Sequence, residues 1–242
     1  MTESIEILNL YAGIGGNCAL WPTEVNGTPI HVTAVEHDPD IAAAYSELWP
    51  NDTVFVGDAH EYLLEHLFDG WDFIWSSPPC QTHSRLNMFA RGKQIVRYPH
   101  LDQLYGEILL LKHMAPNGTK WLVENVIPYY EYLVKVDAIL DRHSAWCGGF
   151  ISPQITLNRV GKRVTTGSRG YKKSRGPHEL WSANKFQEEL GIFLPTSTDK
   201  WEQSKKLQVM RNCVDPRIGL AVFNAALTCV NEHQDTLLEV QV

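Results

Sequence analysis

The first 126 residues alternate short apolar runs with longer segments whose apolar residues recur at helical spacing. Such alternation is typical of βαβ units, in which successive strands run parallel. The expected strands are Ile5–Tyr11, Val32–Glu36, Thr53–Val56, Phe73–Trp75 and Trp121–Val126. The expected helices are Ile41–Trp49, Glu61–Leu67 and Leu101–Met114. This pattern predicts an α/β fold with an open, largely parallel sheet.

The alternation stops near Phe150, where Gly, Ser, Thr and basic residues follow without clear periodicity. Helical patterning returns at Ala183–Leu190 and again in the apolar segment Ile218–Val230. A chain of 242 residues is long enough for one large domain with a small insert. We therefore expect a catalytic and cofactor-binding domain formed by residues 1–150 and 183–242, with a small basic subdomain inserted at 151–182.

The cysteines are odd in number and show no CxxC spacing: Cys18, Cys80, Cys147, Cys213 and Cys229. This pattern argues against a disulfide framework and against a zinc site, so no metal is expected and a reducing, cytoplasmic setting is predicted. The residues before the first apolar run are acidic, and no stretch approaches the length of a membrane span. Neither export nor membrane insertion is expected.

The net charge of −7 hides a strong asymmetry along the chain. No acidic residue occurs between Asp72 and Asp102, or between Asp141 and Glu179. The first interval carries Arg85, Arg91, Lys93 and Arg97, and the second carries Arg142, Arg159, Lys162, Arg163, Arg169, Lys172, Lys173 and Arg175. Either interval alone reads equally well as a solvated loop. Two such runs, one of them following Cys80, favour a path for a polyanion.

A glycine-rich loop follows the first expected strand, in Tyr11-Ala12-Gly13-Ile14-Gly15-Gly16. Glycine lets a backbone turn sharply and approach a ligand closely. Glu36 ends the next strand, where an acid can hydrogen-bond a ribose diol, and His37 could cover an adenine. Asp58 follows the third strand and could accept from an exocyclic amine or cap a helix. These residues predict a nucleoside cofactor, either a nicotinamide dinucleotide or S-adenosylmethionine.

Two reactive side chains stand at the ends of later strands. Cys80 follows the diproline Pro78-Pro79, whose restricted backbone suits a fixed nucleophile better than a packing residue. Glu124 ends an apolar strand, where burial raises the pKa of a carboxyl so that it can donate a proton. Strand ends meet at one edge of a parallel sheet, so we expect this thiol and this carboxyl to converge on one ligand.

Taken together, these segments resemble the DNA cytosine-5 methyltransferases. The resemblance rests on the glycine loop, Glu36, Gly57-Asp58, Pro79-Cys80-Gln81, Glu124-Asn125-Val126 and Asn212-Cys213-Val214-Asp215-Pro216, which occur in the family's order and span most of the chain. It implies a Rossmann-like sheet that binds S-adenosylmethionine, a target-recognition insert, and double-stranded DNA as the partner of a monomer. It also implies the cytoplasm of a bacterium or of a virus-infected host cell.

The resemblance further implies that a flipped cytosine is attacked at carbon 6 by Cys80, while Glu124 bonds ring nitrogen 3. Its cofactor residues would be Tyr11, Ala12, Gly13, Gly15, Gly16, Glu36, His37, Asp58, Pro79 and Asn212. Its DNA contacts would be Gln81 and, apart from Arg142, the cations of the two acid-free intervals, and Arg142 would be catalytic. The family's usual Gln-x-Arg-x-Arg string is missing, and Arg142, followed by His143, is the nearest candidate for its arginine.

Three other interpretations stay open at this point. A tRNA cytosine-5 methyltransferase could use the same thiol chemistry. A catalytically silent DNA-binding homologue would keep the fold without the reaction, although Cys80 and Glu124 argue against it. A nicotinamide oxidoreductase would explain the glycine loop but neither Cys80 nor the basic insert.

Overall fold

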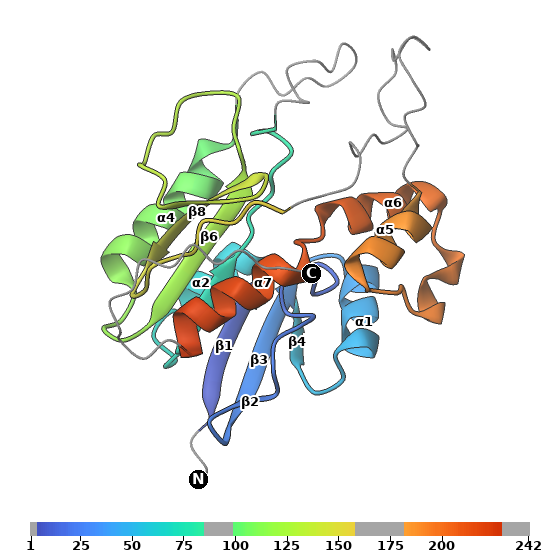
Figure 1. Cartoon of the computed structure of the whole chain (residues 1–242), viewed down its shortest axis with the longest axis horizontal. Helices are drawn as coiled ribbons and strands as arrows, with labels where there is room; N and C mark the ends of the chain where they lie inside the picture. The colour runs from blue at the N-terminus through green and yellow to red at the C-terminus, as the bar shows by residue number, and fades with distance from the viewer. Residues whose placement is uncertain (1–3, 85–98, 158–181, 229–242) are drawn as a thin grey trace.

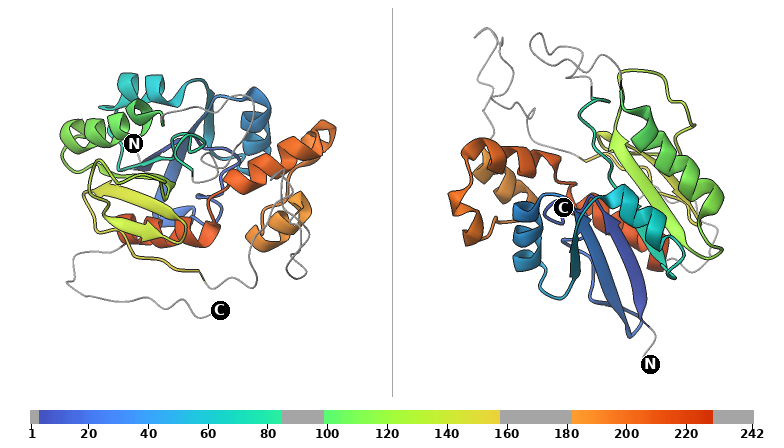
Figure 2. Two further views of the ribbon diagram at one scale, coloured as in Figure 1. Left: turned by 90° about the horizontal axis from the view of Figure 1, so that it is seen from above. Right: turned by 180° about the vertical axis from the view of Figure 1, so that it is seen from behind.

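A computed structural model describes residues 4–84, 99–157 and 182–228. Helices cover both faces of a central sheet (Figures 1 and 2). Helices α2 (Ala59–His66) and α4 (Leu101–Met114) lie on one face, and α7 (Pro216–Phe223) lies across the other. A smaller group packs beside α1 (Pro39–Leu48), namely α5 (Ala183–Leu190), α6 (Gln203–Asn212) and the 3-10 helix η1 (Thr196–Lys200).

The sheet has eight strands in the described part of the chain. They are β1 (Ile5–Leu10), β2 (Glu24–Val25), β3 (Thr28–Glu36), β4 (Thr53–Val56), β5 (Phe73–Ser76), β6 (Lys120–Val126), β7 (Ala138–Leu140) and β8 (His143–Gly148). The parallel strands lie in the order β4-β3-β1-β5-β6. Strand β8 then pairs antiparallel with both β6 and β7, and β2 forms a short hairpin with the start of β3.

The connections reverse direction beside β1. The chain builds outward from β1 through β3 to β4, and then returns to β5 on the other side of β1. In open α/β sheets a ligand binds outside the carboxyl ends of the strands at such a switch point. The topology therefore places the expected binding edge between β1 and β5.

Alternate residues of the strands enter two different cores. Leu8, Ile74 and Val123 pack against α2 and α4. Ile7, Phe73 and Leu122 pack on the opposite face, against α7. Because both faces are covered, these strands read in the sequence as nearly continuous apolar runs.

Most of the predicted elements occur, with shifts at their ends. The bounds of β4, α4 and α5 agree with the prediction, whereas β1 ends one residue early because Tyr11 adopts a φ of 56°. Helix α1 begins at Pro39 because the side chain of Asp38 accepts from the backbone N–H groups of Asp40 and Ile41. The predicted apolar segment Ile218–Val230 begins within α7. The chain then continues as a π-helix, η2 (Asn224–Thr228), at the end of the described residues.

The prediction missed β2, β7, β8 and α6. Strand β8 has small and polar residues between its apolar ones, and α6 carries polar and charged residues on most of its surface. No helix in the described ranges is long and apolar enough to cross a membrane. The predicted insert at 151–182 falls mostly on residues 158–181, which lie outside the described residues.

Candidate active site

Strand register brings the predicted site residues to one edge of the sheet. Leu10, the last residue of β1, pairs with Val35 on one side and with Ser76 on the other. Ser76 in turn pairs with Val123 of β6. The residues that follow these positions are the glycine loop, Glu36, the Cys80 segment and Glu124. They therefore share the carboxyl edge of the parallel strands.

Glu36 anchors the glycine loop. Gly13 has a φ of 57°, which favours glycine, and its N–H donates to Glu36 Oε2 at 3.0 Å. Glu36 Oε1 accepts from the N–H of Asp38 at 2.9 Å and lies 3.0 Å from His37 Nδ1. The Glu36 side chain is buried, whereas that of His37 is 80% exposed. The carboxylate is thus fixed at the mouth of the loop, and Oε2, with one donor from the described residues, can accept another.

The segment after α6 closes the other side of this loop. A Cβ atom on Gly16 would lie 2.5 Å from the Val214 carbonyl oxygen and 2.6 Å from Cys213 Sγ. The loop and the segment after α6 therefore touch, and a side chain at position 16 would force them apart. Asn212, the last residue of α6, is exposed next to this contact. A Cβ on Gly13 would meet nothing within 4 Å, so the loop is open on that side.

Tyr11 is held by a carboxylate that the sequence analysis missed. Its hydroxyl donates to Glu107 of α4, which also accepts from Ser76 Oγ and lies 3.2 Å from His60 Nδ1. Burial, together with the negative charge of Glu107, raises the pKa of Tyr11 far above its usual range. Glu107 is itself fully buried, at helical spacing from Leu104 and Leu111. In the sequence, a single acidic residue among apolar residues at helical spacing was the feature that could have identified Glu107.

Asp58 is the N-cap of α2. Its Oδ1 accepts from the N–H groups of His60 at 2.8 Å and of Glu61 at 3.0 Å. This is the capping alternative that the sequence left open. Both bonds end on Oδ1, and the adenine contact stays a prediction.

The segment that carries Cys80 is tied to the end of β6. Asn125 Nδ2 donates to the Pro78 carbonyl at 2.8 Å, and the Cys80 carbonyl accepts from the N–H groups of His83 and Ser84 at 3.1 Å each. Burial raises the pKa of the Cys80 thiol, and the charge of Glu124 raises it further, while Arg142 and Arg211 lower it. Cys80 and Glu124 are therefore electrostatic neighbours.

Glu124 is buried at the end of β6. Burial raises its pKa to about 7, against the opposing effects of a hydrogen bond from Ser77 and the charge of Arg142. The Ser77 hydroxyl is itself oriented by Trp75 Nε1, which donates to it at 2.8 Å. Arg142, in the turn between β7 and β8, donates to the Arg211 carbonyl at 3.1 Å. The structure thus brings Cys80, Glu124 and Arg142 together and leaves Glu124 able to hold a proton near neutral pH.

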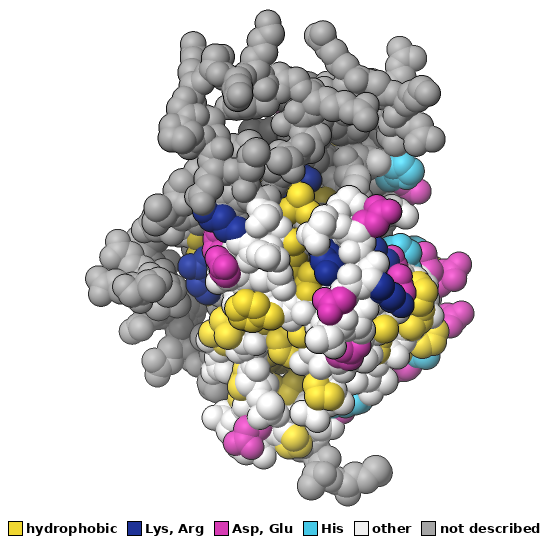
Figure 3. Space-filling view, turned by 90° about the vertical axis from the view of Figure 1, so that its right-hand side faces the viewer, with side chains coloured by type: hydrophobic (Ala, Val, Ile, Leu, Met, Phe, Trp, Pro, Cys, Tyr) yellow, Lys and Arg dark blue, Asp and Glu magenta, His cyan; other side chains and the backbone are white. Residues whose placement is uncertain are grey.

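Few of the predicted DNA contacts can be placed. Gln81 is exposed beside Cys80. The others lie outside the described residues: Arg85, Arg91, Lys93, Arg97, Arg159, Lys162, Arg163, Arg169, Lys172, Lys173 and Arg175. On the side of α1, α5 and α6, basic and acidic side chains of the described residues lie side by side (Figure 3). Lys205, for example, contacts Asp38 at 3.0 Å and Asp40 at 3.1 Å.

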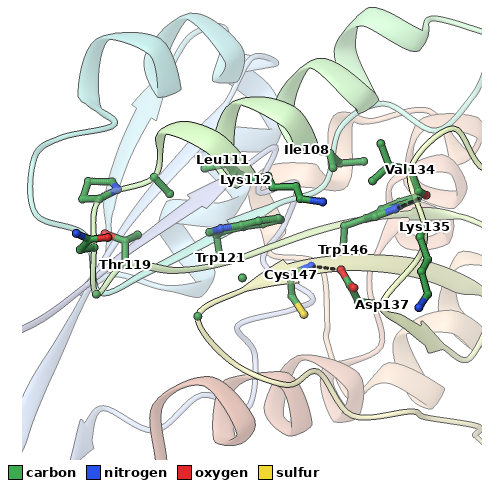
Figure 4. A pocket seen from close by; sticks show the side chains of 16 residues that line it. Ile108, Leu111, Lys112, Thr119, Trp121, Val134, Lys135, Asp137, Trp146 and Cys147 are labelled. Carbon is green, nitrogen blue, oxygen red and sulfur yellow. Dashed lines mark hydrogen bonds between the residues drawn. The ribbon is translucent and has the colours of Figure 1, made fainter.

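A cavity of about 460 Å³ lies away from these groups (Figure 4). It is lined by the C-terminal half of α4, by Trp121 near the start of β6, and by Trp146 and Cys147 of β8. Strand β6 runs from this cavity toward Glu124, so the cavity lies toward the opposite end of the strand from the predicted chemistry. No cluster of potential metal ligands occurs in the described ranges.

No protein-family model matches the sequence, and no curated protein matches it. Among solved structures, the methyltransferase EhMeth of Entamoeba histolytica is similar with a TM-score of 0.58 and 11% identity, over 93% of this chain and 98% of that chain. The Dnmt2 methyltransferase of S. pombe is similar with a TM-score of 0.53 and 14% identity, over the same shares. The chain therefore has the fold of these methyltransferases, and the predicted Rossmann-like methyltransferase sheet is confirmed.

Proposed function

We propose that this chain transfers the methyl group of S-adenosylmethionine to carbon 5 of cytosine in double-stranded DNA, through a covalent adduct of Cys80. The observation that carries the proposal is the meeting of Cys80, Glu124 and Arg142 at the carboxyl edge, where β5 pairs with β1 and the anchored glycine loop follows β1. A fold alone is compatible with many activities. A nucleophile, a proton donor and a cation at one point favour covalent nucleophilic catalysis.

The cofactor site is the glycine loop with Glu36. The loop has open space beside Gly13, and the buried Glu36 carboxylate can accept from a ribose hydroxyl, so these residues fit a nucleoside. Tyr11, Ala12, Gly15, Gly16, His37, Asp58, Pro79 and Asn212 complete the proposed set. When bound, S-adenosylmethionine supplies an electrophilic methyl group on a positively charged sulfur.

Cys80 and Glu124 act on the cytosine ring. The base is flipped from the duplex because carbon 6 cannot be reached inside the stack. The Cys80 thiol gives its proton to water, its sulfur forms a bond to carbon 6, and the proton of Glu124 moves to ring nitrogen 3, which makes carbon 5 electron-rich. Once carbon 5 carries the methyl group, water takes the carbon-5 proton, the C6–S bond breaks to release the Cys80 thiolate, and the proton on nitrogen 3 returns to Glu124.

The protonated state of Glu124 also helps Cys80. A charged Glu124 would raise the pKa of the thiol, whereas Arg142 and Arg211 lower it. When Glu124 is neutral, only the two cations among these three groups act on the sulfur. A neutral acid beside the nucleophile therefore favours thiolate formation as well as proton donation.

The described chain leads into the two groups of predicted DNA-binding cations from points near the catalytic edge. Ser84, which precedes Arg85 in the first group, bridges to Pro128 after β6. Leu157 precedes the second group, which begins at Arg159. Its N–H donates to Asp141 Oδ1 at 3.4 Å, next to Arg142 in the sequence. Cations attached at these points would be close to DNA whose base occupies the site. This supports residues 151–182 as a target-recognition element, and the monomer stays a prediction.

The direct test is methyl transfer from labelled S-adenosylmethionine to a DNA library and, in parallel, to tRNA. We expect label in DNA as 5-methylcytosine, none in tRNA, and none with Cys80→Ala. Cys147→Ala is the matched control, because it removes a partly buried thiol of β8 that the proposed mechanism does not use. Label in tRNA alone would assign the substrate to the alternative, and binding of DNA without transfer would indicate a silent homologue.

A second test identifies the nucleophile. DNA that contains 5-fluorocytosine should trap the enzyme, because fluorine cannot leave as a proton and the adduct persists. Peptide mapping should find the adduct on Cys80. An adduct on another residue, or turnover without any adduct, would refute the assignment.

A further inference from the structure

A buried histidine lies beside the proposed proton donor. Strands β6 and β8 are antiparallel, with Glu124 opposite Ala145 and Val126 opposite His143. His143 is therefore the diagonal neighbour of Glu124 on the same face of the sheet, within reach of its side chain. His143 Nδ1 lies 3.6 Å from Glu124 Oε2. Both residues are less than 10% exposed.

The two carboxyl oxygens of Glu124 have different surroundings. Its Oε2 is enclosed and accepts no hydrogen bond from the described residues at ordinary bonding distance. The polar groups that face this carboxyl are the Ser77 hydroxyl from the segment after β5, Arg142 from the turn before β8, and the Cys80 thiol. His143 Nδ1, at 3.6 Å from Oε2, lies just beyond ordinary hydrogen-bonding distance of it. Catalytic hydrogen bonds are often long in ligand-free proteins and tighten when substrate binds.

We propose that His143 is a positioning residue for Glu124, donating a hydrogen bond from Nδ1–H to Oε2 so that the other oxygen presents its proton to the base. The inference rests on the proposed function, because it concerns the acid of that reaction. When the proton of Glu124 moves to ring nitrogen 3, a carboxylate forms in a buried place. The Nδ1–H bond to Oε2 then becomes charge-assisted and stabilises that carboxylate. No proton leaves His143 in this step.

A pair of substitutions separates this role from packing. His143→Asn keeps an N–H group near the position of Nδ1, whereas His143→Leu keeps bulk and removes every donor. Positioning predicts that the Leu variant loses about 10- to 100-fold in kcat, the range expected for a lost hydrogen bond to a charged group. The Asn variant should stay within a few-fold of the parent. The KM for S-adenosylmethionine should be unchanged in both.

A packing role predicts the opposite order, since leucine fits an apolar neighbourhood better than asparagine does. His113→Leu and His113→Asn, at an exposed position of α4, are the matched controls and should leave kcat unchanged. Equal rates for His143→Leu and His143→Asn, or a slower Asn variant, would overturn the inference.

A second measurement does not depend on methyl transfer. In the complex with target DNA and S-adenosylhomocysteine, where the contact is expected to tighten, carbon-13 NMR of the Glu124 carboxyl should show a pKa that is higher in His143→Leu than in the parent by about one unit, because a donor to the charged form lowers a pKa. An unchanged Glu124 pKa would refute the hydrogen bond even in an active enzyme. A shifted pKa in a protein that methylates neither DNA nor tRNA would instead refute the proposed function.

Discussion

Replacing Glu124 by glutamine should slow methylation strongly and yet stabilise the fold at alkaline pH. Both effects come from one property, which is that burial raises the pKa of Glu124 from about 4.5 to about 7. A glutamine keeps the shape of the side chain and can still accept from Ser77. It cannot supply a proton, and it never becomes a buried charge.

The size of the stability effect follows from linkage. In the unfolded chain Glu124 ionises near 4.5, whereas in the folded protein it resists ionisation until pH 7. The favourable contribution of this carboxyl is thus complete below pH 4.5 and is lost as the pH rises to 7. A difference of about 2.5 units corresponds to about 3 kcal/mol. The stability lost through ionisation of Glu124 is less than about 1 kcal/mol at pH 5 and reaches nearly the full value at pH 8.

Urea denaturation of the parent and of Glu124→Gln at pH 5 and pH 8 measures this effect. The difference in unfolding free energy between the two proteins should grow by about 2.5 kcal/mol in favour of the variant over that interval. Turnover of the variant should fall by about 100-fold or more, with DNA affinity much less affected. A stability difference that does not change with pH would refute the buried, protonated Glu124. Turnover within a few-fold of the parent would remove it from the chemistry.

Three further predictions concern the other groups of the site. Cys80→Ala should leave the affinity for S-adenosylmethionine nearly unchanged in calorimetry, since the thiol acts on the base, and a large loss would place Cys80 in the cofactor site. Glu36→Ala should weaken the same binding by roughly 10- to 150-fold, the value of a lost charged hydrogen bond, and an unchanged constant would mean that the cofactor binds elsewhere. If about five cations of residues 151–182 contact phosphates, the logarithm of DNA affinity should fall against the logarithm of salt with a slope near −4.5. Alanine at each cation should flatten that slope or relax sequence preference, and no change at any of them would move recognition to residues 82–101.

The parallel strands β1, β5 and β6 were predictable from the sequence because they are largely buried and stand out as apolar runs. The ends of such runs must meet at one edge, so the positions of Glu36, Cys80 and Glu124 followed from chain order. Helix ends were less predictable. Helices α1 and α2 start earlier than expected, at points set by the caps Asp38 and Asp58.

The partners of the site residues could not be predicted, because they depend on register and helix rotation. Strand β8 has too few apolar residues to be predicted from the sequence. Neither its antiparallel pairing nor the position of His143 beside Glu124 could therefore be predicted. The contact between Glu107 and Tyr11 joins residues 96 positions apart. It required knowing that α4 packs over the ends of β1 and β5.

Three buried glutamates near the carboxyl edge differ in the hydrogen-bond donors that surround them. Glu36 is met by two backbone N–H groups and a histidine, which suits a fixed acceptor for hydroxyl groups. Glu107 is met by two hydroxyls and a histidine, and it joins β1, β5 and α2 to α4. Glu124 has Ser77, a more distant His143 and the charge of Arg142, and its pKa is raised to about 7. Glu124 has the sparsest close donors of the three, its raised pKa lets it release and recover a proton near neutral pH, and it lies beside Cys80.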